Sequence, residues 1–342
     1  MTEGYRIAAW GSDPVWETFE RPRPSEGEAL VRVDACSIGL TVLNMIRGDL
    51  ADERATLPRV PGHELVGTVV DVGSEHDRNR VGERVTDYIY LFCGSCTECV
   101  AGREDRCLRL AGYIGVHRDG GYSRYTVLPM RNLIRLPDDL DPVTATVIPD
   151  AVSTSVHVCR SRAKVRPYDT VAVIGAGGGV GAHLIQVARL HGAEVIGLEV
   201  EDDKLAMVAD LGARAVKSDD FAALDPRLGG QSAPTVVIDL VGSAPSLGWA
   251  LGALGPGGRL VVLTTFRDIR AELDPRQLVM SESQVLGSRY ATRYEVGLAV
   301  DLVATGRVRP IIGETTGPAG VLRVHELLRS RRLVGRGVLD WT

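Results

Sequence analysis

A glycine-rich turn between an apolar strand and an apolar helix constrains the fold of this chain more than any other feature of its sequence. The stretch reads VAVIGAGGGVGAHLIQVARL, and the strand at 171–174 runs directly into the glycines. Glycines at this spacing allow a tight turn, close approach of the backbone to a pyrophosphate, and close packing of the helix on the strand. The start of the helix adds free N–H groups and a dipole that favour a phosphate. We therefore predict a dinucleotide site, against the alternative of a glycine loop without a ligand, at Gly175, Gly178, Gly179, Val180 and Gly181.

An acidic residue follows at the distance that such a site requires. Glu199 ends the next apolar segment, EVIGLEV, where a carboxylate accepts hydrogen bonds from the adenosine ribose hydroxyls. The residues after it are Val200, Glu201, Asp202 and Asp203, and no arginine is placed to meet a 2′-phosphate. The sequence therefore favours NAD(H) over NADP(H), with Glu199 as a solvated strand end being the alternative. Lys204, in the same segment, is also predicted to bind the cofactor.

The rest of the chain divides into two kinds of sequence. Segments such as TVVIDLVG, SLGWALGALGPGG and RLVVLTTF follow the glycine turn and alternate between strand and helix patterns, which indicates a parallel α/β sheet. Before the turn, EALVRVDACSI and LVGTVVDVG are valine-rich and punctuated by glycine and proline, which indicates a compact β domain. A chain of 342 residues is long enough for both. We predict one domain from 1–147 with 290–342, and a second from 148–289.

Charge and hydropathy exclude several classes of function. The chain has 44 acidic and 39 basic residues, a net charge of −5, so it offers no broad basic field for nucleic acid or a membrane surface. No stretch approaches the roughly 20 apolar residues of a membrane helix. The N-terminal stretch MTEGYRIAAWGSDPVWETFE has early acids and no apolar signal core. We expect a soluble, cytoplasmic protein that acts on a small molecule.

Four of the six cysteines lie in one short loop, CGSCTECVAGREDRC. Short spacings let several thiolates converge on one ion, and four thiolates around zinc leave no open position for a substrate. The loop, at about 93–107, is therefore predicted to be a structural zinc lobe. An iron–sulfur cluster is the alternative, because two of the three spacings are short. The predicted ligands are Cys93, Cys96, Cys99 and Cys107.

The glycine turn and the four-cysteine loop together resemble the zinc-containing alcohol dehydrogenases of the medium-chain dehydrogenase/reductase superfamily. The resemblance covers nearly the whole chain, through GHE, VVIDLVGS, LGPGGRLV and the terminal VGRGVL. It implies a GroES-like β-barrel catalytic domain, a Rossmann domain, an active site in the cleft between them, and a homodimer or homotetramer. It also implies that Arg336 in VGRGVL reaches the cofactor pyrophosphate and that Thr154 packs beside the nicotinamide.

Members of that family carry a second, catalytic zinc that polarises an alcohol or carbonyl oxygen, and the corresponding site is altered in this chain. The family pattern A-C-G-[IV]-C-[GH]-[ST]-D, laid on residues 35–42, puts the ligand cysteine at Gly39, which has no side chain. Val42 replaces an aspartate that supports the histidine ligand, whereas Thr41 keeps the hydroxyl of the proton relay. Cys36 would need a backbone shift to act as a ligand.

Two other ligand positions are kept, so two interpretations of the metal site compete. His63 in PGHE matches the histidine ligand, Asp150 in IPDAVSTSVH matches the third ligand, and Glu64 is the acid that neighbours the zinc. In the first interpretation these side chains still hold zinc, because carboxylates are acceptable ligands. In the second the zinc is lost, because a thiolate is missing and His63 lacks its supporting acid. The second is favoured, because two supporting residues are missing together.

Three functions are consistent with this sequence. The first is an NAD(H)-dependent oxidoreductase that interconverts an alcohol and a carbonyl, with Thr41, His63, Glu64 and Asp150 as catalytic residues. The second is a zinc-free reductase of a conjugated C=C bond, in which His63 with a neighbouring carboxylate supplies the acid. The third is an NAD-binding protein without turnover. The sequence leaves open the substrate, the physiological direction and the presence of the catalytic zinc.

Overall fold

The computed structural model describes residues 1–230, 233–264 and 268–342. The chain forms two compact units, Met1–Asp150 with Thr292–Thr342, and Ala151–Ala291. The sequence analysis predicts the domain boundaries after residues 147 and 289, whereas the units change after Asp150 and Ala291. Within the described residues, every helix is too short or too polar to cross a membrane.

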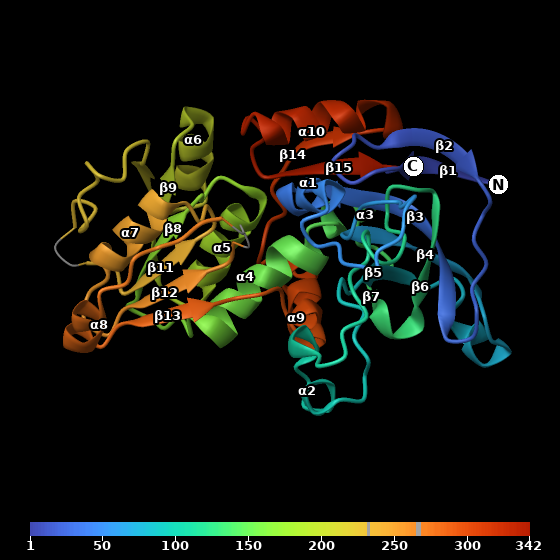
Figure 1. The fold of residues 1–342 in the computed structure, drawn as a ribbon, viewed down its shortest axis with the longest axis horizontal. Coiled ribbons are helices and arrows are strands. Elements are labelled where there is room, and N and C mark those ends of the chain that lie inside the picture. The colour runs from blue at the N-terminus through green and yellow to red at the C-terminus, as the bar shows by residue number, and fades with distance from the viewer. Residues whose placement is uncertain (231–232, 265–267) are drawn as a thin grey trace. The chain divides into compact units, whose positions relative to one another are not determined.

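The first unit is built on a mixed sheet with the strand order β14-β15-β3-β4-β5-β7, and β6 also pairs with β3. All of these pairs are antiparallel except β14 with β15. A separate antiparallel pair joins β1 to β2. Figure 1 shows the red strands β14 and β15 from the end of the chain beside the blue strands from its beginning. The strands are β1 (Thr2–Arg6), β2 (Val15–Phe19), β3 (Glu28–Ile38), β4 (Leu65–Val72), β5 (Arg84–Asp87), β6 (Tyr125–Pro129), β7 (Leu133–Arg135), β14 (Ile312–Thr316) and β15 (Arg336–Asp340).

Strand β3 is the centre of this sheet, because β15, β4 and β6 all pair with it. All of its residues except Glu28 and Arg32 are buried, as expected for a strand covered on both faces. Its bounds are those of the predicted strand EALVRVDACSI, which is thereby confirmed. The main apolar cluster of the unit includes Val31, Leu65, Val85, Leu128 and Leu339.

Short helices surround the sheet of the first unit. The longest, α9, starts at Thr292, whose side chain forms a capping box with Glu295. Helix α1 begins directly after Gly39 and ends at Gly48, which has a left-handed φ of 90°. The α-helices are α1 (Leu40–Arg47), α2 (Thr97–Val100), α3 (Pro142–Ala145), α9 (Arg293–Ala304) and α10 (Val321–Arg329). The 3₁₀ turns are η1 (Glu75–Arg80), η2 (Glu104–Arg106), η3 (Met130–Asn132) and η6 (Pro318–Gly320).

The second unit contains a parallel six-stranded sheet in the order β10-β9-β8-β11-β12-β13. The order reverses beside β8, which is the arrangement of a doubly wound fold and confirms the predicted α/β class. Ile174, Leu198, Val237, Trp249 and Leu260 belong to its apolar core. The strands are β8 (Thr170–Ile174), β9 (Glu194–Glu199), β10 (Arg214–Lys217), β11 (Val236–Asp239), β12 (Arg259–Val262) and β13 (Gln284–Gly287).

A helix lies between most successive strands of this parallel sheet, as expected for parallel neighbours, and α4 precedes its first strand. The helices are α4 (Ser153–His157), α5 (Gly179–Leu190), α6 (Asp202–Asp210), α7 (Ala244–Ala253) and α8 (Pro275–Ser281). Two π-helical turns, η4 (Ile148–Val152) and η5 (Val158–Arg162), flank α4. The predicted strand segment RLVVLTTF gives β12, and its last two residues, 265 and 266, lie outside the described residues.

Candidate active site and metal centre

The PGHE motif places His63 and Glu64 immediately before β4. Gly62 has a φ of +96°, and a Cβ there would lie 2.7 Å from Cδ1 of Tyr122 and 2.9 Å from Sγ of Cys36. Only glycine fits this left-handed and crowded position. The carbonyl of Glu64 accepts a hydrogen bond of 2.9 Å from the N–H of Ser37. The motif is thereby tied to β3, and both acid and histidine become fully buried.

His63, Glu64 and Asp150 converge within the first unit. Nε2 of His63 lies 3.7 Å from Oε1 of Glu64 and 3.8 Å from Oδ2 of Asp150. One donor atom from each residue can be chosen so that all lie within 4.8 Å of one another. Asp150 comes from the π-helical turn η4, a form of helix that is frequent at functional sites. The structure therefore brings together the three side chains that the sequence analysis assigned to the second metal site.

The His63 ring makes no hydrogen bond within the described part of the chain. Both ring nitrogens are buried, and neither has a hydrogen-bond partner among the described residues. Val42, which stands where the resembled family has a supporting aspartate, is also buried and offers no acceptor. A buried polar group without a partner costs free energy, so such a ring is a candidate for contact with a substrate or ligand.

Arg336 lies among these side chains. Its guanidinium Nη1 is 2.9 Å from Oε1 of Glu64, and its Nη2 is 3.0 Å from Oδ2 of Asp150. Only 3% of the surface of Arg336 is exposed. The sequence analysis expected this arginine at the cofactor pyrophosphate. In the structure, two carboxylates of the first unit bind its two terminal nitrogens.

Gly39 borders the guanidinium directly. A Cβ added to Gly39 would lie 1.5 Å from Nη1 of Arg336, far inside the closest contact that two atoms allow. The backbone there is extended, with a φ of −118°, so glycine is not required for conformation. The space that a ligand side chain would need at position 39 is taken by the guanidinium of Arg336.

Burial and the attraction between opposite charges shift the pKa values of this cluster in opposite directions. Burial raises the pKa of Glu64 well above its ordinary value, although the positive charge of Arg336 opposes that rise. Burial lowers the pKa of Arg336. The negative charges of Glu64 and Asp150 together raise it by a larger amount, so the pKa lies above its ordinary value. The arginine is therefore a permanent cation between two acidic groups.

As arranged, these residues do not fit a catalytic zinc. Tetrahedral zinc takes four donors at about 2.0–2.3 Å, and the family's thiolate position is Gly39. A divalent ion between His63 and the two carboxylates would also lie against a guanidinium that already binds both acids. Cys36 does not relieve this shortage, because its buried Sγ packs toward Gly62 and Gly121 and it is not in the donor cluster.

Thr41 lies in the first turn of α1, two residues after Gly39, and is half-buried. The sequence analysis assigned it the proton relay of the resembled family. That role stays a prediction.

The four predicted cysteine ligands of the lobe also converge. Sγ of Cys96 lies 3.4 Å from Sγ of Cys99 and 4.0 Å from that of Cys107, and Sγ of Cys93 lies 3.9 Å from that of Cys99. A tetrahedral zinc with bonds of about 2.3 Å requires sulfurs about 3.8 Å apart. In an iron–sulfur cluster the thiolates bind different irons and lie farther apart. These four side chains therefore fit a single structural zinc ion.

Backbone N–H groups stabilise thiolates in this lobe. The N–H groups of Ser95 and Cys96 point to Sγ of Cys93 at 3.4 Å and 3.3 Å. These contacts lower the pKa of Cys93 to about 5, and the contact from Ser95 makes the largest contribution. A thiolate is the form that binds zinc, so the local backbone favours the metal-binding state.

The glycine turn of the second unit has the form that a dinucleotide site needs. Strand β8 ends at Ile174, Gly175 follows with a φ of +81°, and Gly178 caps the start of α5. A Cβ on Gly181 would lie 2.4 Å from the carbonyl oxygen of Gly175, so the helix packs closely on the turn. Gly179 and Val180 form the first turn of α5, where free N–H groups favour a phosphate.

The side chains around the turn hold it in place. Glu199 ends β9, and its Oε1 accepts a hydrogen bond of 3.0 Å from the N–H of Gly177. Lys204 in α6 is largely buried, and a Cβ on Gly177 would lie 2.5 Å from its Cβ. Thr154 is buried in α4. The cofactor roles of these residues stay predictions.

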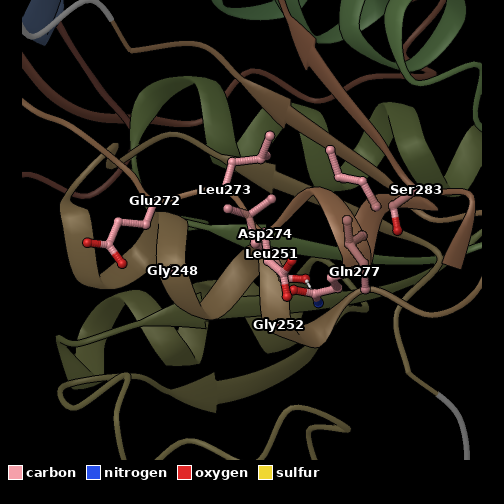
Figure 2. Close-up of a pocket in the computed structure, with 10 residues that line it drawn as sticks. Gly248, Leu251, Gly252, Glu272, Leu273, Asp274, Gln277 and Ser283 are labelled. Carbon is pink, nitrogen blue, oxygen red and sulfur yellow. Dashed lines mark hydrogen bonds between the residues drawn. The ribbon is translucent and has the colours of Figure 1, made fainter. Parts of the chain in front are cut away.

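A separate hollow of about 270 Å³ lies in the second unit beside α7 and α8. Figure 2 shows Gln277 of α8 near Leu251 of α7, whose carbonyl accepts its side-chain N–H at 2.9 Å. None of the predicted site residues lines this hollow. Its lining is Gly248, Leu251, Gly252, Leu254, Glu272, Leu273, Asp274, Gln277, Leu278 and Ser283.

Sequence reasoning missed the contact of Arg336 with Glu64 and Asp150. A signal for it exists in the charge balance of the motifs. If a divalent ion is lost while Glu64 and Asp150 remain, the two carboxyl groups are ionised together only beside another cation. Arg336 is the basic residue of the terminal motif VGRGVL, so it was the residue to test for that role.

Comparisons with known proteins agree with this architecture. Residues 25–138 match a family model described as alcohol dehydrogenase GroES-like domain, and residues 179–305 match one described as zinc-binding dehydrogenase. An alcohol dehydrogenase of Geobacillus stearothermophilus is 33% identical over 94% of this chain and 93% of its own length. An acryloyl-coenzyme A reductase of Metallosphaera sedula is 29% identical over 93% of each chain. A crystal structure of an NAD-dependent alcohol dehydrogenase superposes with a TM-score of 0.87 at 29% identity, over 99% of this chain and all of that one.

Proposed function

This chain belongs to the zinc-type alcohol dehydrogenase family of the medium-chain dehydrogenase/reductase superfamily, and we propose that it is a member that reduces conjugated C=C bonds without a catalytic zinc. The predicted GroES-like and Rossmann domains are those of the family. The protein is accordingly an oxidoreductase that depends on a nicotinamide dinucleotide. Two further questions are which bond is reduced, C=C or C=O, and whether a catalytic zinc takes part. Both are argued from the residues of the first unit.

The observation that carries this proposal is the pair of contacts from Arg336 to Glu64 and Asp150, at 2.9 Å and 3.0 Å. Hydride addition to an isolated carbonyl places the developing charge directly on its oxygen, and zinc stabilises that charge in this family. Here the two carboxylates among the donors for that ion, Glu64 and Asp150, are engaged by a guanidinium. A conjugated C=C bond makes a smaller demand, because its carbonyl already withdraws electrons from the carbon that accepts the hydride.

NAD(H), when bound, supplies the hydride. The hydride is added to the β carbon, a proton is added to the α carbon, and the product is the saturated carbonyl compound with NAD⁺. His63 is the residue best suited to deliver the proton, because it is buried and neither ring nitrogen has a partner among the described residues. Glu64 and Asp150, 3.7 Å and 3.8 Å from its Nε2, hold the ring in an acidic surrounding.

The cofactor proposed is NAD(H) rather than NADP(H). The carboxylate of Glu199 stands at the end of β9, and Glu201, Asp202 and Asp203 follow it. These negative charges repel a 2′-phosphate, whereas a carboxylate accepts hydrogen bonds from ribose hydroxyls. A structural zinc in the four-cysteine lobe accompanies this cofactor. A homodimer or homotetramer in the cytoplasm stays a prediction.

Alcohol–carbonyl interconversion is the second candidate. It is favoured by the convergence of His63, Glu64 and Asp150, whose donor atoms lie within 4.8 Å of one another. The alcohol dehydrogenase of Geobacillus stearothermophilus is also more similar in sequence than the acryloyl-coenzyme A reductase, at 33% against 29% identity. A matched pair of substrates separates the two candidates.

The test compares 2-cyclohexen-1-one with cyclohexanone, which share a ring and differ in the C=C bond. With NADH deuterated at C4, we expect the enone to give cyclohexanone that carries deuterium on the β carbon, detected by mass spectrometry. We expect no alcohol from cyclohexanone. Reduction of cyclohexanone to the alcohol at a comparable rate would overturn the proposal, as would the absence of turnover on either compound and on an acryloyl thioester.

The His63→Gln variant tests the proton donor. General acid catalysis contributes roughly a hundredfold or more, so we expect a loss of at least that order in the rate of enone reduction. The matched control is His76→Gln, because His76 is exposed in η1 and lies outside the cluster. A rate in His63→Gln equal to that of the control would remove His63 from the mechanism.

A further inference from the structure

We propose that Arg336 takes the place of the catalytic metal ion: its guanidinium is the built-in cation of the site, and Gly39 is the residue that makes room for it. The inference deepens the proposed function, because it explains how the site keeps two buried acids without zinc. Its evidence lies wholly within the first unit.

The sheet explains how the guanidinium reaches this position. Strand β3 lies between β15 and β4. The last pair of β3 with β15 joins Ile38 to Gly337, so Arg336 and Gly39 are the next residues in the same antiparallel register. On the other side of β3, Glu64 is bonded to Ser37 through its backbone carbonyl. The side chain of Arg336 therefore crosses over the end of β3, past Gly39, to reach Glu64.

Any side chain at position 39 would obstruct this crossing. A Cβ on Gly39 would lie 1.5 Å from Nη1 and 2.8 Å from Cζ of Arg336, and 3.4 Å from Oε1 of Glu64. A cysteine there, as in the resembled family, cannot coexist with the guanidinium in this position. The glycine with the guanidinium in this position is therefore an alternative to a cysteine with a metal ion, and this position of Arg336 requires the glycine.

The charges lead to the same conclusion. Glu64 is fully buried, the side chain of Asp150 is 13% exposed, and both face the same small volume. Two carboxyl groups in such a volume are ionised together only beside a cation, which is either a metal ion or a basic side chain. A planar guanidinium can serve more than one carboxylate. Here Nη2 donates a hydrogen bond to Oδ2 of Asp150, and Nη1 forms an ion pair with Oε1 of Glu64. The carboxylates of Glu64 and Asp150 thus already flank a positive charge.

The first test is the zinc content of the purified wild-type protein, measured by elemental analysis without added metal or chelator. We expect one zinc per chain, held by the four-cysteine lobe, and no increase after incubation with excess zinc and removal of the unbound ion. This count needs no variant. Two zinc ions per chain in the wild-type protein would overturn the proposal.

The second test rebuilds the metal site with the double variant Gly39→Cys, Arg336→Ala. It restores the thiolate and removes the guanidinium, so we expect the zinc count to rise from one to two per chain. The matched control is Gly39→Ser, Arg336→Ala, which removes the same guanidinium but offers no thiolate. We expect it to release its second zinc to a competing chelator at least tenfold more readily, since thiolate is the better ligand for zinc.

The single variant Gly39→Cys completes the comparison. With Arg336 still present, we expect the zinc count to stay at one. A folded double variant that binds only one zinc, or a single variant that binds two, would overturn the proposal. If the double variant does not fold, the wild-type count decides alone.

The readout distinguishes this inference from the proposed function. A wild-type protein with one zinc that reduces cyclohexanone would refute the choice of the C=C bond and leave the role of Arg336 intact. A wild-type protein with two zinc ions that reduces only the enone would have the opposite meaning.

Discussion

Nη1 of Arg336 lies 2.9 Å from Oε1 of Glu64, although the segments that carry the two residues flank β3 on opposite sides. The contact is possible only because Gly39, at the end of β3, has no side chain. An ion pair buried to this degree behaves differently from a surface pair. Removing one partner leaves an uncompensated charge, and the cost is then several kcal/mol.

The Gly39→Ala variant is expected to destabilise the protein strongly. The new Cβ would displace the guanidinium and break its contact with Glu64, which costs roughly 3 to 5 kcal/mol for a buried pair. Urea denaturation measures this loss as a lower midpoint. Gly297→Ala is the control, because Gly297 lies in α9 with open space around it and such a change is neutral or slightly stabilising. Equal midpoints for the two variants would show that the guanidinium does not need the space at Gly39.

The Glu199→Gln variant is expected to weaken the binding of NADH. Gln keeps an oxygen that can accept from the N–H of Gly177 but removes the negative charge that ribose hydroxyls would meet. Replacing a charge-assisted hydrogen bond by a neutral one costs about 1–1.5 kcal/mol, which raises the Kd roughly five- to tenfold. Fluorescence titration with NADH measures the change. Glu201→Gln, on the exposed residue two positions later, should bind NADH as the wild type does. A wild-type Kd in Glu199→Gln would exclude this carboxylate from the ribose site.

The Cys96→Ser variant is expected to lose the structural zinc. Cys96 lies within 4.0 Å of the sulfurs of Cys99 and Cys107, and a hydroxyl is a poor substitute for a thiolate in such a set. We expect the zinc count to fall from about one to near zero, with a lower thermal midpoint because metal binding contributes to folding. Cys159→Ala is the control, since that buried thiol lies outside the cluster. Retention of one zinc by Cys96→Ser would contradict the assignment of the lobe.

Acid is expected to destabilise the first unit through His325. Its Nε2 lies 3.0 Å from the hydroxyl of Tyr122, and the ring is fully buried. Burial first, and the charge of Arg329 second, lower its pKa to about 4, while Asp13 opposes the shift. Between pH 6.5 and pH 4, His325 is protonated in the unfolded chain but stays neutral in the folded chain. Stability is therefore lost as the pH falls from 6.5 to 4, by a total of about 3 kcal/mol.

Urea denaturation at pH 7 and pH 4.5 measures this dependence. In the His325→Phe variant the difference in the free energy of unfolding between the two pH values should shrink, whereas the exposed His76→Gln variant should keep it. The phenyl ring preserves the stacking on Tyr122, whose ring centroid lies 5.8 Å away. An unchanged pH dependence in His325→Phe would assign the acid sensitivity to other groups.

Much of the fold follows from local sequence patterns. The valine-rich stretch EALVRVDACSI has the same bounds as β3, and the strand before the glycine turn ends where β8 ends. These elements are predictable because period, apolar content and glycine punctuation act over a few residues. The four-cysteine lobe is predictable for the same reason, since its ligands lie within one loop.

The cluster around Arg336 is only partly predictable from the sequence. The resemblance to a family brought His63, Glu64 and Asp150 together, but it placed Arg336 at a cofactor. The contact of Arg336 with Glu64 depends on the pairing of β15 with β3, strands that are far apart in the sequence. The contact of Tyr122 with His325 depends on equally distant segments. Such contacts leave no periodic or spacing signal, because register and long-range packing decide them.

The delivery of a cation by β15 has a consequence for when the site becomes charged. A metal site fills in proportion to the free ion around it, so its occupancy varies with supply and competition. The guanidinium of Arg336 reaches its position when β15 pairs with β3. Every folded chain therefore carries one such cation, whatever the metal concentration in solution. In this protein the positive charge beside Glu64 and Asp150 is therefore fixed by the folding of the chain itself.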